Sequence, residues 1–408
     1  MSIPRIYFDS LWKEISERKI SILLGARQVG KSTLLRQLED QAKKQGLATS
    51  FYDLEQSADL KRLSGNAETV IQELTRKRQI IFIDEFHYLK NASKIFKAIY
   101  DSRKRVKIYA SGSSSLEIHK HLKESLAGRF FKTSIFPLSL IEWHQVRNFR
   151  DIHYLTWGGL PGLISQKTND KKLALLDNIL STYITKDIKG LIKEENVRAF
   201  NSVLYLLAQS QGSMTSASNL ARETGLSEST IARHLEVMIQ TYVLHPLLSY
   251  STNLANELKK SKKYYFYDLG IRNALLKDVR PAGVRDDKGV LYETAIALHL
   301  IFQLKPNMEL RFWRTKKGEE VDFVLLKNRI PVPIEVKSRI NKPEIPLGIK
   351  SFFRIYPVAP FALIFNESLE TEIEDAAGHK IYFKKWQAAS NLDYLKRIYS
   401  AKTVNFGV

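Results

Sequence analysis

One nine-residue segment constrains this chain more than any other. Residues 25–33 read GARQVGKST, which fits the pattern G-x-x-x-x-G-K-[ST]. The segment lies between an apolar run, residues 20–24, and a stretch with helical spacing, residues 34–38. A strand, this pattern and a helix in succession are the context in which a phosphate-binding loop forms. The segment therefore predicts a nucleoside triphosphate site in an α/β fold.

The residue types of this loop suit phosphate groups. Gly25 and Gly30 permit a tight turn whose N–H groups face inward, beside the positive end of the next helix. Lys31 can reach the β- and γ-phosphates, and the Ser32 hydroxyl can bind Mg²⁺. The predicted ATP-binding set from this loop is Gly25, Arg27, Gly30, Lys31, Ser32 and Thr33.

A second strand-like segment ends in two acidic residues. Residues 80–83 are apolar, and Asp84 and Glu85 follow them, which is the Walker B pattern. A buried parallel strand delivers such acids to the carboxyl edge of a sheet, where ligands bind. We expect Asp84 to hold Mg²⁺ through its water shell and Glu85 to polarise the attacking water.

A third strand-like segment, residues 106–110, runs into the polar stretch 111–115. A hydroxyl at the tip of the strand beside Asp84 can sense the γ-phosphate, and Ser113 is the candidate for this role. The same Ser/Gly composition is also typical of an ordinary loop. Both interpretations of Ser113 stay open.

Composition limits the class of protein. The 408 residues suffice for two or three domains, and the absence of cysteine excludes disulfides and thiolate metal sites. No apolar run reaches the ~20 residues of a membrane span and the N-terminus lacks a signal-peptide core, so we expect a cytoplasmic protein without membrane contact. The net charge of +20 favours polyanionic partners, with nucleic acid, here DNA, ahead of an anionic membrane surface. A highly charged surface without such a partner is the alternative.

These motifs together resemble those of prokaryotic AAA+ ATPases of the AAA_14 type, which carry a C-terminal DUF4143 region. Residues 126–129 (LAGR), 136–139 (FPLS) and 158–161 (GGLP) add to the resemblance. It implies a Mg²⁺-dependent ATPase that works as a homo-oligomer, for example a hexameric ring. It also identifies Arg129 as the candidate arginine finger, a cation that neutralises charge on the transferred phosphoryl group. An ordinary surface arginine is the alternative.

Residues 1–139 form the predicted AAA+ core. The region that follows this core divides into further predicted domains. Apolar residues with helical spacing across residues 140–195 predict a small helical lid over the nucleotide. Residues 196–260 contain a helix, a glycine turn, a Ser-capped second helix and a wing strand, and they resemble a winged helix. The last domain is predicted to cover residues 261–408.

The predicted winged helix offers few basic residues for DNA. Arg233 and His234 lie on the second helix, whose exposed face can enter a groove, although many such modules contact only protein. A basic run follows the wing and includes Lys262 and Lys263. It is either a set of phosphate contacts or a solvated loop.

The last third of the chain carries a second group of acidic residues. Glu293 lies in a helix-like segment, and Asp322 alternates with apolar residues in a strand-like one. Glu335 and Lys337 are two residues apart in the next strand and therefore share a face. Two carboxylates and an ammonium at one edge predict a divalent-metal site.

The order of these elements resembles the PD-(D/E)XK nuclease fold. The resemblance implies that Asp322 and Glu335 bind Mg²⁺, that Glu293 helps to orient metal or water, and that Lys337 orients the attacking water. It also makes Arg314 a possible phosphate contact. Val321 stands where the family usually has proline. Ordinary strands with cross-strand Glu and Lys neighbours are the alternative.

The predicted fold class is α/β: a P-loop AAA+ parallel sheet with a helical lid, then a winged helix and a restriction-endonuclease-like domain. The leading functional hypothesis is an ATP-hydrolysing protein that moves or remodels DNA, branched DNA included, and carries a nuclease-like domain. The alternative is a switch in which ATP binding sets the oligomeric state and the C-terminal region binds a protein partner.

Overall fold

The computed structural model describes most of the chain. It covers residues 3–77, 79–102, 105–113, 126–146, 149–183, 188, 197–251 and 261–391. Residues 114–115 of the polar stretch after the third strand lie outside these ranges. Among the described helices, none combines the length and the apolar character that crossing a bilayer requires.

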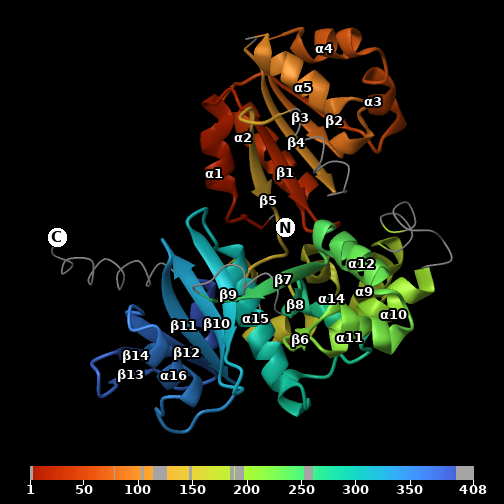
Figure 1. Cartoon of the computed structure of the whole chain (residues 1–408). Helices are drawn as coiled ribbons and strands as arrows, with labels where there is room; N and C mark the ends of the chain where they lie inside the picture. Colours follow the sequence, from red (N-terminus) through yellow and green to blue (C-terminus); the bar gives the residue numbers. More distant parts are fainter. Residues whose placement is uncertain are drawn as a thin grey trace.

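Five parallel strands form the sheet of the N-terminal lobe, at the top of Figure 1: β1 (Ile20–Gly25), β2 (Thr49–Asp53), β3 (Ile80–Asp84), β4 (Lys107–Ser113) and β5 (Phe130–Ser134). They lie in the order β2-β3-β4-β1-β5. Strands β1 and β3 are buried along their whole length, as parallel strands are when both faces of a sheet are covered. The predicted P-loop sheet is confirmed.

Helices cover both faces of this sheet: α1 (Phe8–Lys13), α2 (Lys31–Lys44), α3 (Ser57–Arg62), α4 (Ala67–Thr75) and α5 (Ala92–Asp101), with the short 3-10 turns η1 (Glu14–Ser16) and η2 (Phe86–Tyr88). Leu34 and Leu38 of α2 are one helical turn apart and pack with Phe82 on one face. Phe96 of α5 packs with Ile83 on the other face.

A second, mixed sheet forms the C-terminal half of the chain: β6 (Met214–Thr215), β7 (Leu244–Ser249), β8 (Lys262–Phe266), β9 (Met308–Arg314), β10 (Glu320–Lys327), β11 (Ile330–Lys337), β12 (Phe361–Asn366), β13 (Thr371–Glu374) and β14 (Lys380–Lys385). The order is β13-β14-β12-β11-β10-β9-β7-β8-β6. Strands β9, β10 and β11 are antiparallel neighbours, whereas β11, β12 and β14 run parallel.

Two helices sandwich the larger part of this sheet: α15 (Lys288–Phe302) and α16 (Leu347–Ile355), and the turn η7 (Trp386–Ser390) packs beside α15. Along β10, Phe323 joins the core that contains α15, and Val324 joins the core that contains α16. Successive residues thus face opposite sides, which is the period of a strand covered on both faces.

The strands of the predicted winged helix belong to this same sheet. Leu248 of β7 pairs with Arg311 of β9 in a parallel register, while the other edge of β7 pairs with β8. The predicted domain boundary between residues 260 and 261 therefore separates β8 from its own hairpin. The structure differs from that boundary because the free edge of β7 finds its hydrogen-bond partners on β9, which joins the two regions into one sheet.

The region predicted as a helical lid divides among three cores. It contains α7 (Leu140–Trp143), α8 (Asp151–Trp157), the turn η3 (Pro161–Ser165) and α9 (Asn169–Thr182). Trp143 and Tyr154 pack with α15 of the C-terminal half. Leu176 and Ile179 of α9 pack with α2. The described helices of this region thus do not form one lid. The helix α9, the turn η3 and Trp157 at the end of α8 lie against the N-terminal lobe, whereas α7 and the rest of α8 pack with α15.

The predicted helix-turn-helix is present: α10 (Val197–Gln209), α11 (Ala217–Thr224) and α12 (Glu228–Gln240). The side chain of Ser227 caps α12 by accepting the N–H of Thr230, and Gly225 has a φ of +70° in the turn. Arg233 is exposed, but His234 is buried and packs edge-on against Phe200. The expectation that His234 faces a DNA groove is wrong, because helical spacing places it on the core side.

A buried arginine near the N-terminus ties the phosphate loop to the chain that leaves the sheet. The Arg5 guanidinium donates to the carbonyls of Val29 at 2.6 Å and Phe136 at 2.7 Å. It also pairs with Glu142 of α7 at 2.7 Å. The Glu142 side chain in turn accepts the Ser139 N–H at 2.7 Å and completes a capping box.

We expect the substitution Arg5→Met to lower the free energy of unfolding of the N-terminal lobe by about 3–5 kcal/mol, because the Glu142 carboxylate is left buried without its cation. Urea denaturation followed by circular dichroism measures this change. The exposed Lys44 on α2 offers a control, since Lys44→Met should change the free energy by no more than about 0.5 kcal/mol. Equal effects of the two substitutions would contradict the role given to Arg5.

Candidate functional site

The phosphate loop has the backbone of an anion cradle. A Cβ on Gly25 would lie 2.2 Å from the carbonyl oxygen of Ile135, and Gly30 has a φ of +92°. Both positions therefore require glycine. Lys31 is buried, and its ammonium donates to the carbonyls of Gly25 at 3.1 Å and Ala26 at 2.8 Å. The loop thus holds a cation within reach of any anion that enters it.

The start of α2 is open to such an anion. Ser32 and Thr33 are exposed in its first turn, and no side chain caps the helix at Gly30. The first N–H groups of the helix and its dipole therefore favour a negatively charged ligand. The Ser32 hydroxyl and the Asp84 carboxylate are oxygen donors of the kind that Mg²⁺ prefers, so the residues present fit this ion.

Two carboxylates lie at the carboxyl edge of the same sheet. Asp84 ends β3, is buried, and accepts a hydrogen bond from the Ser111 hydroxyl of β4. Glu85 follows with a φ of +52°, which turns the chain sharply after the strand. Its Oε2 atom accepts the N–H of Ser113 at 3.0 Å and lies 3.1 Å from Nδ1 of His87.

Glu85 is held in its charged form. Burial favours the neutral acid, but the contact with His87, the charge of Lys31 and the Ser113 N–H outweigh burial and lower the pKa of Glu85 to about 2. So acidic a carboxylate is a weak proton acceptor at neutral pH. The predicted role of Glu85, to polarise a water molecule, stays a prediction.

Strand β4 supplies two polar groups at this edge, Ser111 and Ser113, of which the sequence predicted only Ser113. Ser113 lies at the site, and its backbone N–H rather than its hydroxyl contacts Glu85. Ser111, which holds Asp84, was not among the predicted site residues. A signal was present in the sequence, because residues 111 and 113 are two apart on one strand and share a face.

Arg129 lies away from this site within one chain. It precedes β5 at the amino edge of the sheet, and the phosphate loop follows β1 at the carboxyl edge. The guanidinium pairs with Asp101 at 2.9 Å and is partly exposed. A role as an arginine finger therefore requires that Arg129 reach the site of a second copy of the chain.

The second group of acidic residues gathers where β8, β10, β11 and α15 meet. Glu335 is buried, and its Oε1 accepts a hydrogen bond from the Lys337 ammonium at 2.7 Å. The predicted shared face of these two residues is thus present. Asp322 accepts the N–H of Val336 at 2.8 Å, and Glu293 accepts the Tyr265 hydroxyl at 2.5 Å.

These carboxylates repel one another. Burial and the charge of Asp322 together raise the pKa of Glu293 to about 7 and that of Glu335 to about 7. Burial also raises the pKa of Asp322, against the nearby charges of Lys263 and Lys337. The Oε2 atom of Glu335 is buried and has no hydrogen-bond partner among the described residues. The described residues therefore satisfy the Glu335 carboxylate only in part.

Lys263 belongs to this cluster and not to a DNA-binding surface. Its side chain is buried, and its ammonium lies 2.7 Å from Glu320 and 3.7 Å from Glu293. The structure contradicts the predicted phosphate contact at Lys263. Side chains alternate along β8, so residue 263 faces inward, whereas Lys262 stays half-exposed. Arg314 is exposed and pairs with Glu320 at 3.2 Å.

The residues predicted to bind metal lie in one cluster, where Asp322 raises the pKa of both Glu293 and Glu335. Within the described ranges, no three His, Asp or Glu side chains are grouped as ligands of one ion. A metal role for Glu293, Asp322 and Glu335 therefore stays a prediction. Tyr265 and Glu320 are members of the cluster that sequence reasoning missed, since only the pairing of β8 with the rest of the sheet brings Tyr265 near.

Comparison with family models divides the chain into three regions. An AAA domain model matches residues 17–144. The N-terminal lobe is therefore similar to AAA domains. Two domains of unknown function follow, DUF8612 at residues 150–281 and DUF4143 at residues 288–384. The resemblance to AAA_14-type proteins with a C-terminal DUF4143 region is thus confirmed.

Similar curated proteins span most of the chain but carry no functional description. An uncharacterized protein of Mycobacterium tuberculosis is 25% identical over 358 residues, which are 87% of this chain and 78% of that protein. An uncharacterized protein of Methanocaldococcus jannaschii is 24% identical over 408 residues, covering 88% of this chain and 83% of the relative.

Similar solved structures include DnaA from Aquifex aeolicus bound to AMPPCP, with 13% identity and a TM-score of 0.31 over 57% of this chain and 85% of that one. A Pif1 helicase from Candida albicans has 14% identity and a TM-score of 0.26 over 43% of this chain and 47% of the helicase. Similarity of this degree supports no argument about function.

The acidic cluster predicts a specific pH dependence. The pKa of Glu293 and of Glu335 rises from 4.5 to about 7 on folding, so the folded state binds more protons than the unfolded state between these values. Stability should therefore fall as the pH rises from 4.5 to about 7. We expect Asp322→Asn to make this fall less steep, because burial is the larger cause of both raised pKa values and the Asp322 charge, which the substitution removes, adds to it.

Melting temperatures across this pH range test the expectation. Asp177→Asn on the exposed face of α9 is the matched control and should leave the slope unchanged. An Asp322→Asn variant with the same slope as the parent chain would show that the charge of Asp322 does not raise the pKa of Glu293 or of Glu335.

Proposed function

We propose that this chain is an ATP-hydrolysing AAA protein that acts on DNA. The observation that carries the ATPase part is that Lys31 of the phosphate loop and Glu85 are both buried and follow strands β1 and β3 at the same carboxyl edge of the parallel sheet. The DNA part is supported by the net charge of +20 and by the helix-turn-helix of α11 and α12.

The chain's own residues suggest how hydrolysis would proceed. When phosphates enter the loop, Lys31 exchanges its bonds to Gly25 and Ala26 for bonds to phosphate oxygens. Ser32 and Asp84 would hold Mg²⁺, which supplies charge neutralisation at the phosphates. Glu85 orients the attacking water, and the hydrogen bond from Ser113 couples its position to β4.

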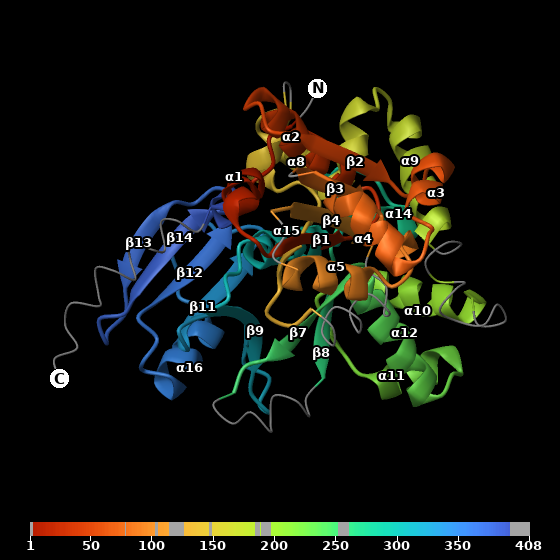
Figure 2. The ribbon, with the colours of Figure 1, turned by 90° about the horizontal axis from the view of Figure 1, so that it is seen from above.

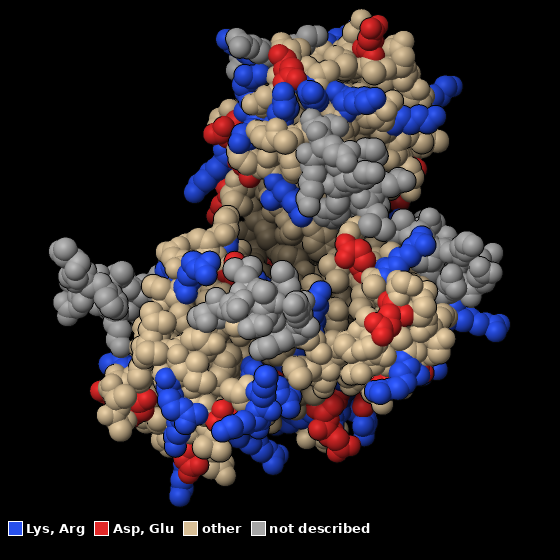
Figure 3. Space-filling model, viewed as in Figure 1, with Lys and Arg blue, Asp and Glu red and all other residues tan. Residues whose placement is uncertain are grey.

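DNA contact would rest on the exposed basic residues rather than on one concentrated patch. In the view of Figure 3, Lys and Arg are distributed over both lobes of the molecule. Of the predicted contacts, Arg233 and Arg314 are exposed and Lys262 is half-exposed. Such a distribution favours backbone contacts, which depend on charge, over the reading of base edges.

Two substitutions separate ATP binding from hydrolysis. Lys31→Ala should weaken ATP binding by about tenfold or more, because a charge-assisted hydrogen bond is lost. Glu85→Gln should keep ATP binding and lower turnover by about a hundredfold. Glu68→Gln on the exposed face of α4 is the control and should match the parent chain. Turnover that survives Glu85→Gln would remove Glu85 from the catalytic role.

Turnover with and without DNA tests the second part of the proposal. We expect single-stranded, duplex or four-way-junction DNA to raise the rate of ATP hydrolysis, and the stimulated rate to disappear in Lys31→Ala. Binding should weaken as salt is added, since phosphate contacts release counterions. If no DNA binds or stimulates, a nucleotide-dependent switch with a protein partner takes the place of this proposal.

A second candidate function rests on the unpartnered Glu335 oxygen. A buried carboxylate oxygen without a donor is a position at which a cation can bind. With Asp322 and Lys337 beside it, the site has the groups that metal-dependent phosphodiester hydrolysis uses. We propose that the DUF4143 region binds Mg²⁺ here and cuts DNA.

Strand cleavage in Mg²⁺ tests this second function. Cleavage should be lost in Asp322→Asn and Glu335→Gln and should persist in the control Asp177→Asn. It should also persist in Lys31→Ala if ATP is not needed for the chemistry. Cleavage that is unchanged in both acidic-site variants would come from elsewhere.

A further inference from the structure

The acidic centre of the DUF4143 region contains a cation that comes from another part of the chain. Lys263 lies on β8, in the part that matches DUF8612, whereas Glu293 and Glu320 lie in the part that matches DUF4143. The side chain of Lys263 is 3% exposed, and its ammonium is 2.7 Å from Glu320 and 3.7 Å from Glu293. Its charge also interacts with that of Asp322. One region of the chain therefore supplies the acids and another supplies the lysine.

The strand that carries Lys263 packs closely on this centre. Tyr265 is two residues further along β8, on the same face, and donates its hydroxyl to Glu293 at 2.5 Å. Gly212, in the turn before β6, has a φ of +80°, and a Cβ there would lie 3.0 Å from Oε1 of Glu293. The glycine thus lets the backbone of the predicted winged helix approach this acid.

Lys263 supplies the positive charge that these acids require. A buried ammonium loses its hydration and is stable only beside groups of opposite charge. The second ammonium of the centre, that of Lys337, pairs with Glu335 at 2.7 Å. Even with both lysines in place, the buried Oε2 atom of Glu335 has no hydrogen-bond partner among the described residues. The centre therefore has an oxygen left for a further cation, but Lys263 already lies among its acids.

A divalent ion and Lys263 would compete for the same carboxylates. Both are cations, and the repulsion between them is strong at short distance in a buried site, where water screens charge poorly. Oxygen donors such as Asp322 and Glu335 suit Mg²⁺, and the lysine neutralises part of the charge that attracts the ion. Access of Mg²⁺ to the centre therefore depends on where the Lys263 ammonium lies.

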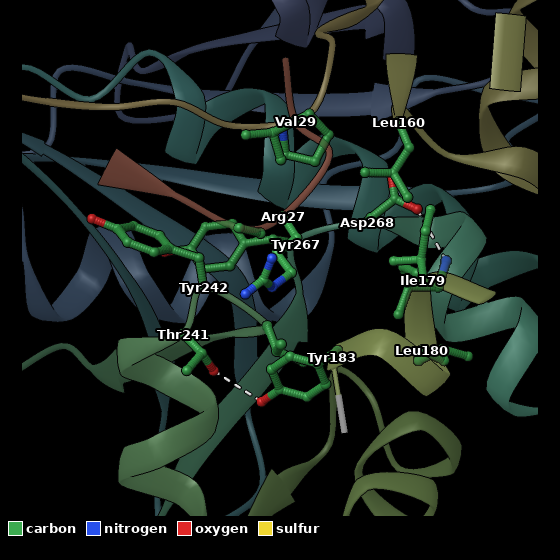
Figure 4. Close-up of a pocket in the computed structure, with 14 residues that line it drawn as sticks. Arg27, Val29, Leu160, Ile179, Leu180, Tyr183, Thr241, Tyr242, Tyr267 and Asp268 are labelled. Carbon is green, nitrogen blue, oxygen red and sulfur yellow. Dashed lines mark hydrogen bonds between the residues drawn. The ribbon is translucent and has the colours of Figure 1, made fainter. Parts of the chain in front are cut away.

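The other end of β8 lies beside the phosphate loop. Tyr267 and Asp268 follow the strand and line a small apolar pocket together with Arg27 and Val29 of the loop (Figure 4). Four residues, about 13 Å of extended chain, separate Lys263 from Tyr267. A shift of β8 that moves Lys263 is therefore also a shift of the chain that borders the phosphate loop.

This end of β8 is attached to the segments that leave the N-terminal lobe. The Tyr267 ring stacks on Phe136, which follows β5, with the ring centroids 5.1 Å apart. Asp268 accepts the N–H of Gly159 at 2.7 Å, and its carboxylate also caps the helix α14 (Leu269–Leu275). These contacts connect the strand that carries Lys263 to the lobe that carries the phosphate loop.

We propose that Lys263 is an internal cation that closes the acidic centre to Mg²⁺, and that a displacement of β8 opens it. The inference rests on the second candidate function, because it requires the acids of the DUF4143 region to bind the ion. It goes beyond that function by making the hairpin of β7 and β8 an inhibitor of the centre. The lysine leaves with β8, the strand whose other end lies beside the phosphate loop.

Calorimetric titration of the full chain with MgCl₂, in the absence of nucleotide, measures this competition. Asp322→Asn identifies the heat that comes from the acidic centre, because it removes a predicted ligand. We expect Lys263→Met to tighten the Asp322-dependent binding of Mg²⁺ by about tenfold or more, since a competing charge is removed. Lys262→Met is the matched control on the same strand. Its side chain is half-exposed, and its affinity should equal that of the parent chain.

A second measurement uses the parent chain and so does not depend on the folding of a variant. Acetic anhydride acetylates accessible lysines, and mass spectrometry reports the extent at each position. We expect Lys263 to be protected without Mg²⁺ and to be acetylated severalfold faster at saturating Mg²⁺, because its ammonium must leave the acids. The acetylation of Lys262 should not change.

Two results would overturn the inference while the second candidate function stands. One is a parent chain that binds Mg²⁺ at the Asp322-dependent site as tightly as Lys263→Met does. The other is a Lys263 that stays protected while Mg²⁺ is bound, since the lysine is then only a structural ion pair. If Lys263→Met is folded by circular dichroism but shows no Asp322-dependent binding, the centre is not a metal site. The second candidate function then fails, and the inference fails with it.

Discussion

The phosphate-loop end of the molecule depends on the contacts of the buried Arg5 guanidinium. It donates to the loop carbonyl of Val29 and to the carbonyl of Phe136, and it neutralises Glu142. These partners are far apart in the sequence, yet one planar side chain satisfies all of them. An arginine suits this position because its fork of donors stays charged and its geometry is rigid. The phosphate loop therefore rests on the same group that orients the chain as it leaves the AAA sheet toward the C-terminal half.

The two acidic centres of the molecule show how surroundings assign chemistry to the same functional group. At the AAA edge, His87, Lys31 and an N–H group hold Glu85 charged in spite of its burial. Where β8, β10 and β11 meet, burial and mutual repulsion push the carboxylates toward the neutral form, although Lys263 and Lys337 lie beside them. The second centre retains a buried Glu335 oxygen that has no donor among the residues that the structure describes.

The N-terminal and C-terminal halves of the chain are in contact through the hairpin of β7 and β8. In Figure 2, the AAA sheet lies above the broad C-terminal sheet, and the helices of the middle region lie to one side. The hairpin of β7 and β8 extends the C-terminal sheet through Leu248 and Arg311, while the residues around this hairpin also border the pocket beside the phosphate loop. The segments that flank this hairpin therefore lie beside the phosphate loop, and the hairpin itself belongs to the C-terminal sheet.

The local patterns of the sequence were sufficient for the phosphate loop, the acidic strand end, the helix-turn-helix and the shared face of Glu335 and Lys337, because each depends on neighbours within a few residues. These local patterns could not predict contacts between segments that are distant in the sequence. The burial of Lys263 among acids, the division of residues 140–195 among three cores and the pairing of β7 with β9 follow from which surfaces meet in space. Periodicity states that a residue faces a core, but it does not state which core. Tertiary packing alone decided that the basic residue nearest the second acidic centre serves that centre and that one sheet joins the two predicted C-terminal domains.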